Sequence, residues 1–186
     1  MLGEIATHHR GKRIEVWFQD EARFGQQGTL RRVWARRGTR PRAVRQTKYE
    51  WLYVIGAVCP STGQSVGLLA PTIHAEMINA FFEQFAHEVD PEVHVVMVWD
   101  QAGFHRAKAV RPPVNVTLVP LPPYSPELNP VENLWHYLRS HHWSNRTYAD
   151  YDALRFAAIE AWHKAALNPE LIQSVCRASY DSAFNY

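Results

Sequence analysis

The run from Val93 to Trp99 constrains the fold most, because it is apolar at almost every position. A strand that is apolar on both faces must be covered on both faces, which is typical of the interior of a parallel sheet. Asp100 follows this run directly, at the carboxyl end of the predicted strand. Open α/β sheets bind ligands just outside the carboxyl ends of their strands. The sequence therefore predicts a functional carboxylate at this sheet edge.

A second predicted strand, Arg13 to Gln19, alternates between apolar and polar side chains. Asp20 ends this run and, because side chains repeat every two residues, falls on the apolar face of the strand. Neighbouring strands lie about 4.8 Å apart. If the two strands are adjacent, the carboxylates of Asp20 and Asp100 can therefore share one cation.

The proline-rich segment LPPYSPELNPVENLW, Leu121 to Trp135, brings a third carboxylate, Glu132, to the start of a predicted helix. Two interpretations are open. In the first, Asn129 is the N-cap, Pro130 is the first helical residue, and Glu132 closes a capping box. In the second, Glu132 lies at the edge of the apolar stripe of the helix and faces a cleft.

Under the second interpretation, the three acids form a cluster that requires cations. Two ionised carboxylates about 4 Å apart repel each other by roughly 4 kcal/mol at an effective dielectric near 20. Oxygen ligands favour Mg²⁺ or Mn²⁺, and two such ions can support an in-line phosphoryl transfer. This pattern is typical of a metal-dependent phosphodiester enzyme.

The rest of the chain predicts one mixed α/β domain, because 186 residues with 46% hydrophobic content suit a single core. Thr72 is the expected N-cap of a long helix that ends at Asp90 and connects two strands. Further strands are predicted at residues 29–34, 49–58, 64–69 and 116–119, and further helices at residues 130–141, 148–166 and 169–178.

Several classes of protein are disfavoured. Cys59 and Cys176 are too few for a disulfide framework and favour a reducing compartment. His136 and His141 are five residues apart, whereas zinc-binding pairs on a helix commonly lie four apart, which argues against structural zinc. The N-terminus lacks an apolar signal segment, and no run approaches the roughly 18 apolar residues of a membrane span. We therefore expect a cytoplasmic protein without membrane contact.

A basic segment, Thr29 to Lys48, contains no acid and predicts a nucleic-acid partner, although the net charge of the chain is only +2. The expected DNA-binding residues are its eight cations: Arg31, Arg32, Arg36, Arg37, Arg40, Arg42, Arg45 and Lys48. The alternative is a solvated hairpin with no partner.

Three blocks of the sequence resemble the signature blocks of Tc/mariner-superfamily transposases, in the same order: QDEARFG (Gln19 to Gly25), WDQAGFH (Trp99 to His105) and the proline-rich segment. The most similar branch is the bacterial insertion-sequence one, the DDE superfamily endonucleases. The resemblance implies a ribonuclease-H-like mixed sheet, with antiparallel first strands and then parallel strands, flanked by helices.

The resemblance also implies an activity. Asp20, Asp100 and Glu132 would bind two Mg²⁺ or Mn²⁺ ions, nick DNA at transposon ends, and join the exposed 3′-hydroxyl to target DNA, typically at TA. His105 lies in the second block and is expected either to contact DNA phosphate, to orient a water molecule, or only to pack. Gln101 departs from the family pattern, since relatives commonly have Asn there.

Family members usually carry an N-terminal helix-turn-helix region that recognises the transposon ends, and this chain begins almost directly at the catalytic blocks. We therefore expect residues 1–186 to form a single catalytic domain. It would be associated with the bacterial nucleoid and bind DNA weakly and with little sequence preference. A second copy of the chain and a separate helix-turn-helix chain are its candidate partners, and the chain is either a separate reading frame or a truncated copy of a longer transposase. Two alternatives remain: a catalytically inactive DNA-binding or assembly module, and a nuclease without strand transfer.

Overall fold

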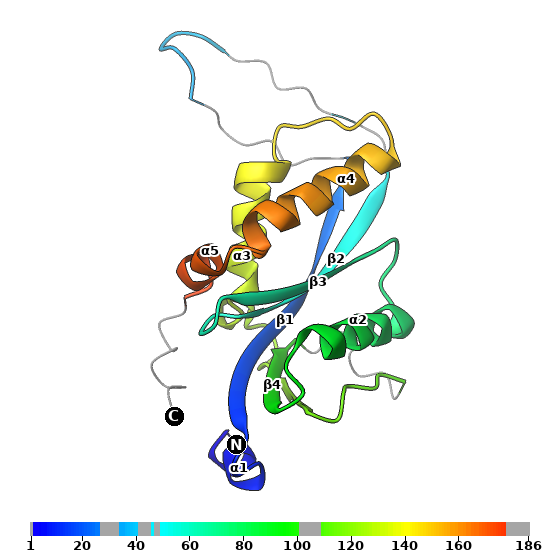
Figure 1. Ribbon diagram of the computed structural model, residues 1–186. Helices are drawn as coiled ribbons and strands as arrows, with labels where there is room; N and C mark the ends of the chain where they lie inside the picture. The colour runs from blue at the N-terminus through cyan, green and yellow to red at the C-terminus, as the bar shows by residue number, and fades with distance from the viewer. Residues whose placement is uncertain (1, 27–33, 41–45, 47–48, 101–108, 178–186) are drawn as a thin grey trace.

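A five-stranded mixed sheet organises the chain, as the computed structural model shows for residues 2–26, 34–40, 46, 49–100 and 109–177 (Figure 1). Its strands are β1 (Arg13–Gly25), β2 (Trp51–Cys59), β3 (Gln64–Ala70), β4 (Val93–Trp99) and β5 (Val116–Pro120). Their order is β3-β2-β1-β4-β5, with antiparallel pairing among the first three and parallel pairing of β1 with β4 and of β4 with β5. The predicted mixed sheet is confirmed.

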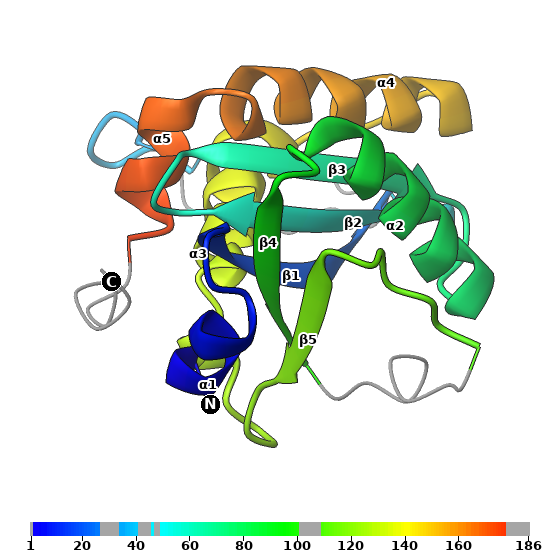
Figure 2. The same ribbon diagram turned by 60° about the horizontal axis from the view of Figure 1, so that its bottom comes forward.

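Helices cover both faces of the sheet (Figure 2). The elements are α1 (Leu2–His8), α2 (Ala75–Glu88), a 3₁₀ turn (Pro126–Leu128), α3 (Val131–Leu138), a π-helical turn (Arg139–Trp143), α4 (Tyr151–Ala161), a second π-helical turn (Trp162–Ala166) and α5 (Pro169–Val175). Helix α2 packs on one face through Ile78, Phe81 and Phe85. Helices α3, α4 and α5 pack on the other face. No helix within the described ranges is long and apolar enough to cross a membrane.

Strand β4 has the predicted bounds and the predicted environment. Val95, Val96 and Met97 are each 0% exposed, because the strand lies between β1 and β5 and has apolar layers on both faces. The reasoning from its uninterrupted apolar run is therefore confirmed.

Strand β1 is longer than predicted, and the expectation that Asp20 ends it is wrong. Its parallel pairing with β4 reaches only Phe18, whereas its antiparallel pairing with β2 continues to Gly25. Asp20 therefore lies just beyond the end of the β1–β4 pairing, where the two strands separate. Val16 and Phe18 pack against the helical layer of α3, α4 and α5, so the apolar face of β1 was assigned correctly.

Other element boundaries differ from the predictions. Helix α2 begins at Ala75 with His74 as its N-cap, two residues after the predicted N-cap Thr72. The helix predicted at residues 148–166 begins later, where the side chain of Asp150 accepts a hydrogen bond from the Ala153 N–H (2.8 Å) and acts as the N-cap. Helix α1 was not predicted. The predicted strand at residues 29–34 falls almost entirely outside the described residues.

Candidate active site

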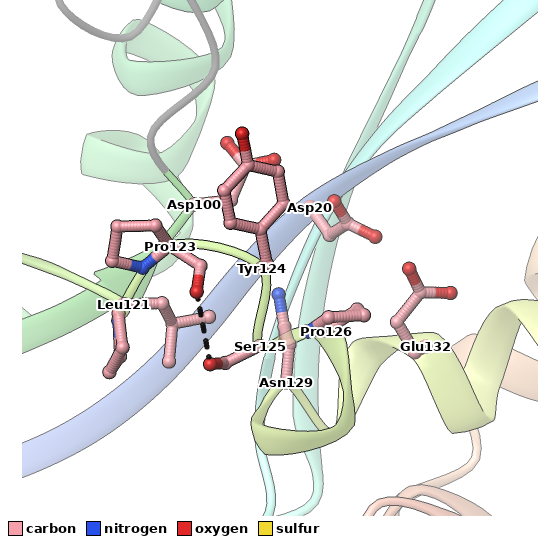
Figure 3. A pocket seen from close by; sticks show the side chains of 10 residues that line it. Asp20, Asp100, Leu121, Pro123, Tyr124, Ser125, Pro126, Asn129 and Glu132 are labelled. Atoms are coloured by element: carbon pink, nitrogen blue, oxygen red, sulfur yellow. Dashed lines mark hydrogen bonds between the residues drawn. The ribbon is translucent and has the colours of Figure 1, made fainter.

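A cavity of about 460 Å³ lies at the carboxyl end of β4 and contains all three predicted acids (Figure 3). Asp20 comes from the middle of β1, Asp100 follows β4, and Glu132 is in the first turn of α3. The proline-rich segment forms the rest of the lining: Leu121, Pro122, Pro123, Tyr124, Ser125, Pro126 and Asn129. Three carboxylates that are distant in sequence therefore share one solvent-filled space.

Sheet register places the two aspartates at equivalent positions on neighbouring strands. Phe18 pairs with Val98 in the parallel ladder between β1 and β4. Two residues further along each chain are Asp20 and Asp100. The predicted adjacency of their strands is confirmed.

Trp135 holds the carboxylate of Asp20. Its indole Nε1 donates a hydrogen bond to Oδ2 of Asp20 (2.8 Å), and its ring is fully buried against the sheet. Glycine at position 56 of β2 allows this approach, because a Cβ there would lie only 2.7 Å from Cη2 of Trp135. Trp135 follows Glu132 by three residues and so lies on the same side of α3.

Asn129 fixes the start of α3 against β1. Its Nδ2 donates to the backbone carbonyl of Gln19 (3.0 Å), and its Oδ1 accepts from the Val131 N–H (3.2 Å). The Asn129 N–H donates to the carbonyl of Pro126 (2.9 Å) instead of to the Glu132 carboxylate. The capping-box interpretation of Glu132 is therefore wrong, and this carboxylate lines the cavity.

The environment of Asp20 disfavours its ionised form. Burial, followed by the charges of Glu21 and Glu132, raises the pKa of Asp20 to about 7, although the Trp135 hydrogen bond partly opposes this change. Glu21 accepts a hydrogen bond from Nε2 of Gln19 (2.8 Å), which places it on the opposite face of β1 from Asp20, as predicted. The charge of Glu132 raises the pKa of Asp20, because the two carboxylates repel each other when both are ionised. A nearby cation would relieve this repulsion.

Comparison with known proteins identifies the family. The sequence pattern described as DDE superfamily endonuclease matches residues 15–155. The chain belongs to this family. A 41% identical relative, "Uncharacterized protein y4pE/y4sA" of Sinorhizobium fredii (strain NBRC 101917 / NGR234), aligns over 125 residues, or 67% of this chain and 93% of the relative.

Solved structures of Mos1 show the same fold. The Mos1 strand transfer complex matches with a TM-score of 0.62 and 16% identity, covering 94% of this chain and 54% of that chain. The Mos1 mariner paired end complex with Mn matches with a TM-score of 0.66 and 15% identity, covering 87% and 51%. This chain therefore spans about half the length of the Mos1 chains, and its sheet is ribonuclease-H-like, as expected.

Within this DDE endonuclease fold, the three acids line one cavity without converging on a single point. No group of three His, Cys, Asp or Glu side chains in the described part of the chain is close enough to hold one ion. In Figure 3 the carboxylates of Asp20 and Glu132 point into the same space, while Asp100 lies behind the ring of Tyr124. The donor set is nevertheless entirely oxygen and negatively charged, which suits Mg²⁺ or Mn²⁺.

The other predicted residues lie away from the cavity or outside the described structure. Arg36, Arg37 and Arg40 are exposed and do not line the cavity. The remaining predicted residues fall outside the described residues: Arg31, Arg32, Arg42, Arg45, Lys48 and His105. Sequence reasoning treated Trp135 only as a core residue and Asn129 only as a cap. No local pattern in the sequence indicates the contact of Trp135 with Asp20, because the two residues are 115 positions apart.

Replacing Trp135 by Phe should lower both stability and activity, and should also shift the pH dependence of activity. The variant keeps an aromatic ring in the core but loses the donor to Asp20, and a hydrogen bond to a charged group contributes about 1.5–3 kcal/mol to stability. A DNA cleavage reaction that uses ionised Asp20 should fall at least about 10-fold at neutral pH, and its pH dependence should move to higher pH because the pKa of Asp20 loses a lowering influence.

Trp17 is the matched control for this variant, since its buried indole Nε1 also donates to a carboxylate, Oε2 of Glu15 (3.0 Å), but packs on the α2 face of the sheet and does not line the cavity. Trp17→Phe should leave the pH dependence of cleavage unchanged. Identical pH profiles for wild type and Trp135→Phe would show that the indole N–H does not position Asp20.

Proposed function

We propose that this chain is the catalytic domain of a DNA transposase, which cleaves DNA strands and joins the exposed 3′-hydroxyl to a second duplex. The observation that carries the proposal is the cavity shared by Asp20, Asp100 and Glu132 on a DDE endonuclease fold. Its similarity in fold to the Mos1 strand transfer complex supports the same class of reaction. Transposon ends, a TA-containing target, a homodimer and a separate helix-turn-helix chain are the proposed partners.

Asp20, Asp100 and Glu132 would hold two Mg²⁺ or Mn²⁺ ions. When bound, such ions supply positive charge to the attacking and leaving oxygens of a phosphoryl transfer. The oxygen-only donor set and the repulsion between Asp20 and Glu132 support this assignment. The Mos1 paired end complex with Mn supports it from a protein of the same fold.

The residues around the acids act by positioning. Trp135 orients one oxygen of Asp20, and Asn129 ties the start of α3, which carries Glu132, to the residue that precedes Asp20. Hydrolysis would break one P–O ester bond, with water as the nucleophile and the 3′-oxygen leaving as a hydroxyl. Joining would form one P–O ester bond from that hydroxyl and break one in the target strand, so neither step requires a Ser or Cys nucleophile from the protein. The chain therefore needs to provide only an ordered set of carboxylates and a surface for the DNA backbone.

The basic segment is proposed as part of that DNA surface, and its contribution is measurable through salt. If five of its cations contact phosphates, the logarithm of affinity should fall against the logarithm of salt concentration with a slope of roughly −4.5. Simultaneous replacement of Arg36, Arg37 and Arg40 by Ala should reduce that slope by about 2.7 if all three contact phosphates. Fluorescence anisotropy with a labelled duplex measures both slopes.

Arg155→Ala on α4 is the control for this series, because Arg155 is also exposed but pairs with Asp152 (3.2 Å) outside the basic segment. A nearly flat salt dependence of the wild type would contradict the proposed DNA surface. A nanomolar preference for one terminal repeat would contradict the expected weak, sequence-tolerant binding.

A joining assay tests the proposed function. A labelled duplex with a free 3′-hydroxyl is incubated with supercoiled plasmid in Mg²⁺, in Mn²⁺ and in chelator. We expect labelled plasmid only with the metal ions, none with Asp100→Asn, and unchanged joining with Asp90→Asn, an exposed aspartate outside the cavity. Nicking without joining would favour a nuclease, and binding without either reaction would favour the inactive module.

A further inference from the structure

The segment Pro122 to Pro126 forms a largely exposed wall of the cavity, and the residues that flank it are anchored beside both aspartates. At one end, the buried Leu121 donates its N–H to the carbonyl of Trp99 (2.8 Å), the residue before Asp100. At the other end, Asn129 donates to the carbonyl of Gln19 (3.0 Å), the residue before Asp20. The position of this wall relative to the two acids is therefore fixed at both ends.

Tyr124 stands in the middle of this wall with its side chain 100% exposed. Its backbone has φ of 58°, a left-handed conformation that is an outlier for a bulky residue and costs about 1 kcal/mol or more. Prolines at positions 122, 123 and 126 restrict the chain on both sides of it. The backbone at Tyr124 is therefore held in an unfavourable conformation, although the ring of this residue is exposed and adds nothing to the core.

The volume of the cavity limits which part of a DNA substrate can lie against the ring of Tyr124. The cavity volume of about 460 Å³ suits a ligand of the size of one nucleotide and excludes a whole duplex. Tyr124 lines this cavity with an exposed ring, so the base of such a nucleotide can lie against it (Figure 3). Removing a base from its stack costs a few kcal/mol unless another flat surface replaces its neighbour.

From these observations we infer that the ring of Tyr124 stacks on the nucleobase adjoining the phosphate that reacts in the cavity. This inference rests on the proposed function and names the part of the substrate that this residue recognises. Every base has a π-face, so the contact tolerates any sequence. A tyrosine side chain on a proline-restricted backbone loses little conformational entropy on binding.

The test uses a duplex whose 3′-terminal nucleotide carries 2-aminopurine, together with the same duplex made abasic at that position. Stacking contributes about 1–3 kcal/mol per base, so Tyr124→Ala should weaken binding to the base-bearing duplex by about 5- to 150-fold. Tyr124→Ala should also abolish the quenching of 2-aminopurine fluorescence that accompanies binding to the wild type. Tyr124→Phe, which keeps the ring, should bind within about twofold of wild type, and the abasic duplex should bind wild type and Tyr124→Ala equally.

Phe156→Ala provides the control, since Phe156 is an aromatic residue that is 62% exposed on α4 and does not line the cavity. Because the side chain of Tyr124 is fully exposed, its variants should melt at the wild-type temperature. The inference is overturned if Tyr124→Ala binds the base-bearing duplex as wild type does, or loses equal affinity for the abasic duplex.

Failure of the inference and failure of the proposed function are distinguishable. If wild type joins DNA and Tyr124→Ala binds normally, only the stacking role is lost. If Tyr124→Ala shows the base-dependent loss of binding but wild type yields no nicked or joined product, the stacking role stands and the transposase activity is contradicted.

Discussion

Glu132→Gln is expected to slow DNA cleavage and joining by about 10³-fold. A carboxylate that helps to hold catalytic metal ions contributes several kcal/mol of transition-state stabilisation, and each 1.36 kcal/mol corresponds to a factor of ten in rate. Gln has the same shape but carries no charge, so it cannot replace the carboxylate as a strong ligand for Mg²⁺. The rate of product formation in the joining assay measures the effect.

The matched control is Glu170→Gln, because Glu170 also lies in the first turn of a helix, α5, but is exposed and outside the cavity. Its rate should equal that of wild type. A rate for Glu132→Gln within threefold of wild type would remove Glu132 from the catalytic set, and equal melting temperatures would establish that both variants are folded.

Asp20→Asn is expected to make the metal-free protein more stable, and more so at higher pH. The pKa of Asp20 in the folded state is about 7, against an ordinary value of 3.8. The folded state therefore binds this proton more tightly than the unfolded state, and the wild type loses stability as pH rises from about 4 to about 7. The full loss is about 4 kcal/mol, which follows from 1.36 kcal/mol for each pKa unit.

Asn does not ionise and can still accept the hydrogen bond from Trp135, so the variant escapes this loss. In chelator, urea unfolding should show a stability gain of about 2 kcal/mol at pH 5.5 that grows to about 4 kcal/mol at pH 8. Asp90→Asn, at an exposed site, should show no such growth. A gain for Asp20→Asn that is independent of pH would contradict the raised pKa.

The parts of the fold that were predictable follow from local pattern. The apolar run of β4 fixed its bounds and its parallel pairing, and the period-two pattern of β1 placed Asp20 on the correct face. The full length of β1 was not predictable, because residues 21–25 remain in the strand through pairing with β2, which follows about 25 residues later. The N-terminus of α2 was also misplaced, because His74 occupies the cap position without a side-chain hydrogen bond.

The grouping of the three acids in one cavity was predictable, but the contacts around them were not. The three sequence blocks identified Asp20, Asp100 and Glu132, which share a cavity. The hydrogen bond from Trp135 to Asp20 depends on the orientation of a buried ring over Gly56, and residues so distant in sequence carry no local signal of that contact. The role of Asn129 was likewise assigned locally, as a cap, while its amide also reaches the carbonyl of Gln19 in β1.

Counting the Mn²⁺ ions bound to the protein–DNA complex, by electron paramagnetic resonance, tests most directly whether Asp20, Asp100 and Glu132 act as one ion-binding set. We predict two ions for wild type and for Asp90→Asn, and fewer or more weakly bound ions for each of Asp20→Asn, Asp100→Asn and Glu132→Gln. The same number of ions with the same affinity in wild type and in all three cavity variants would contradict the proposed metal-dependent mechanism.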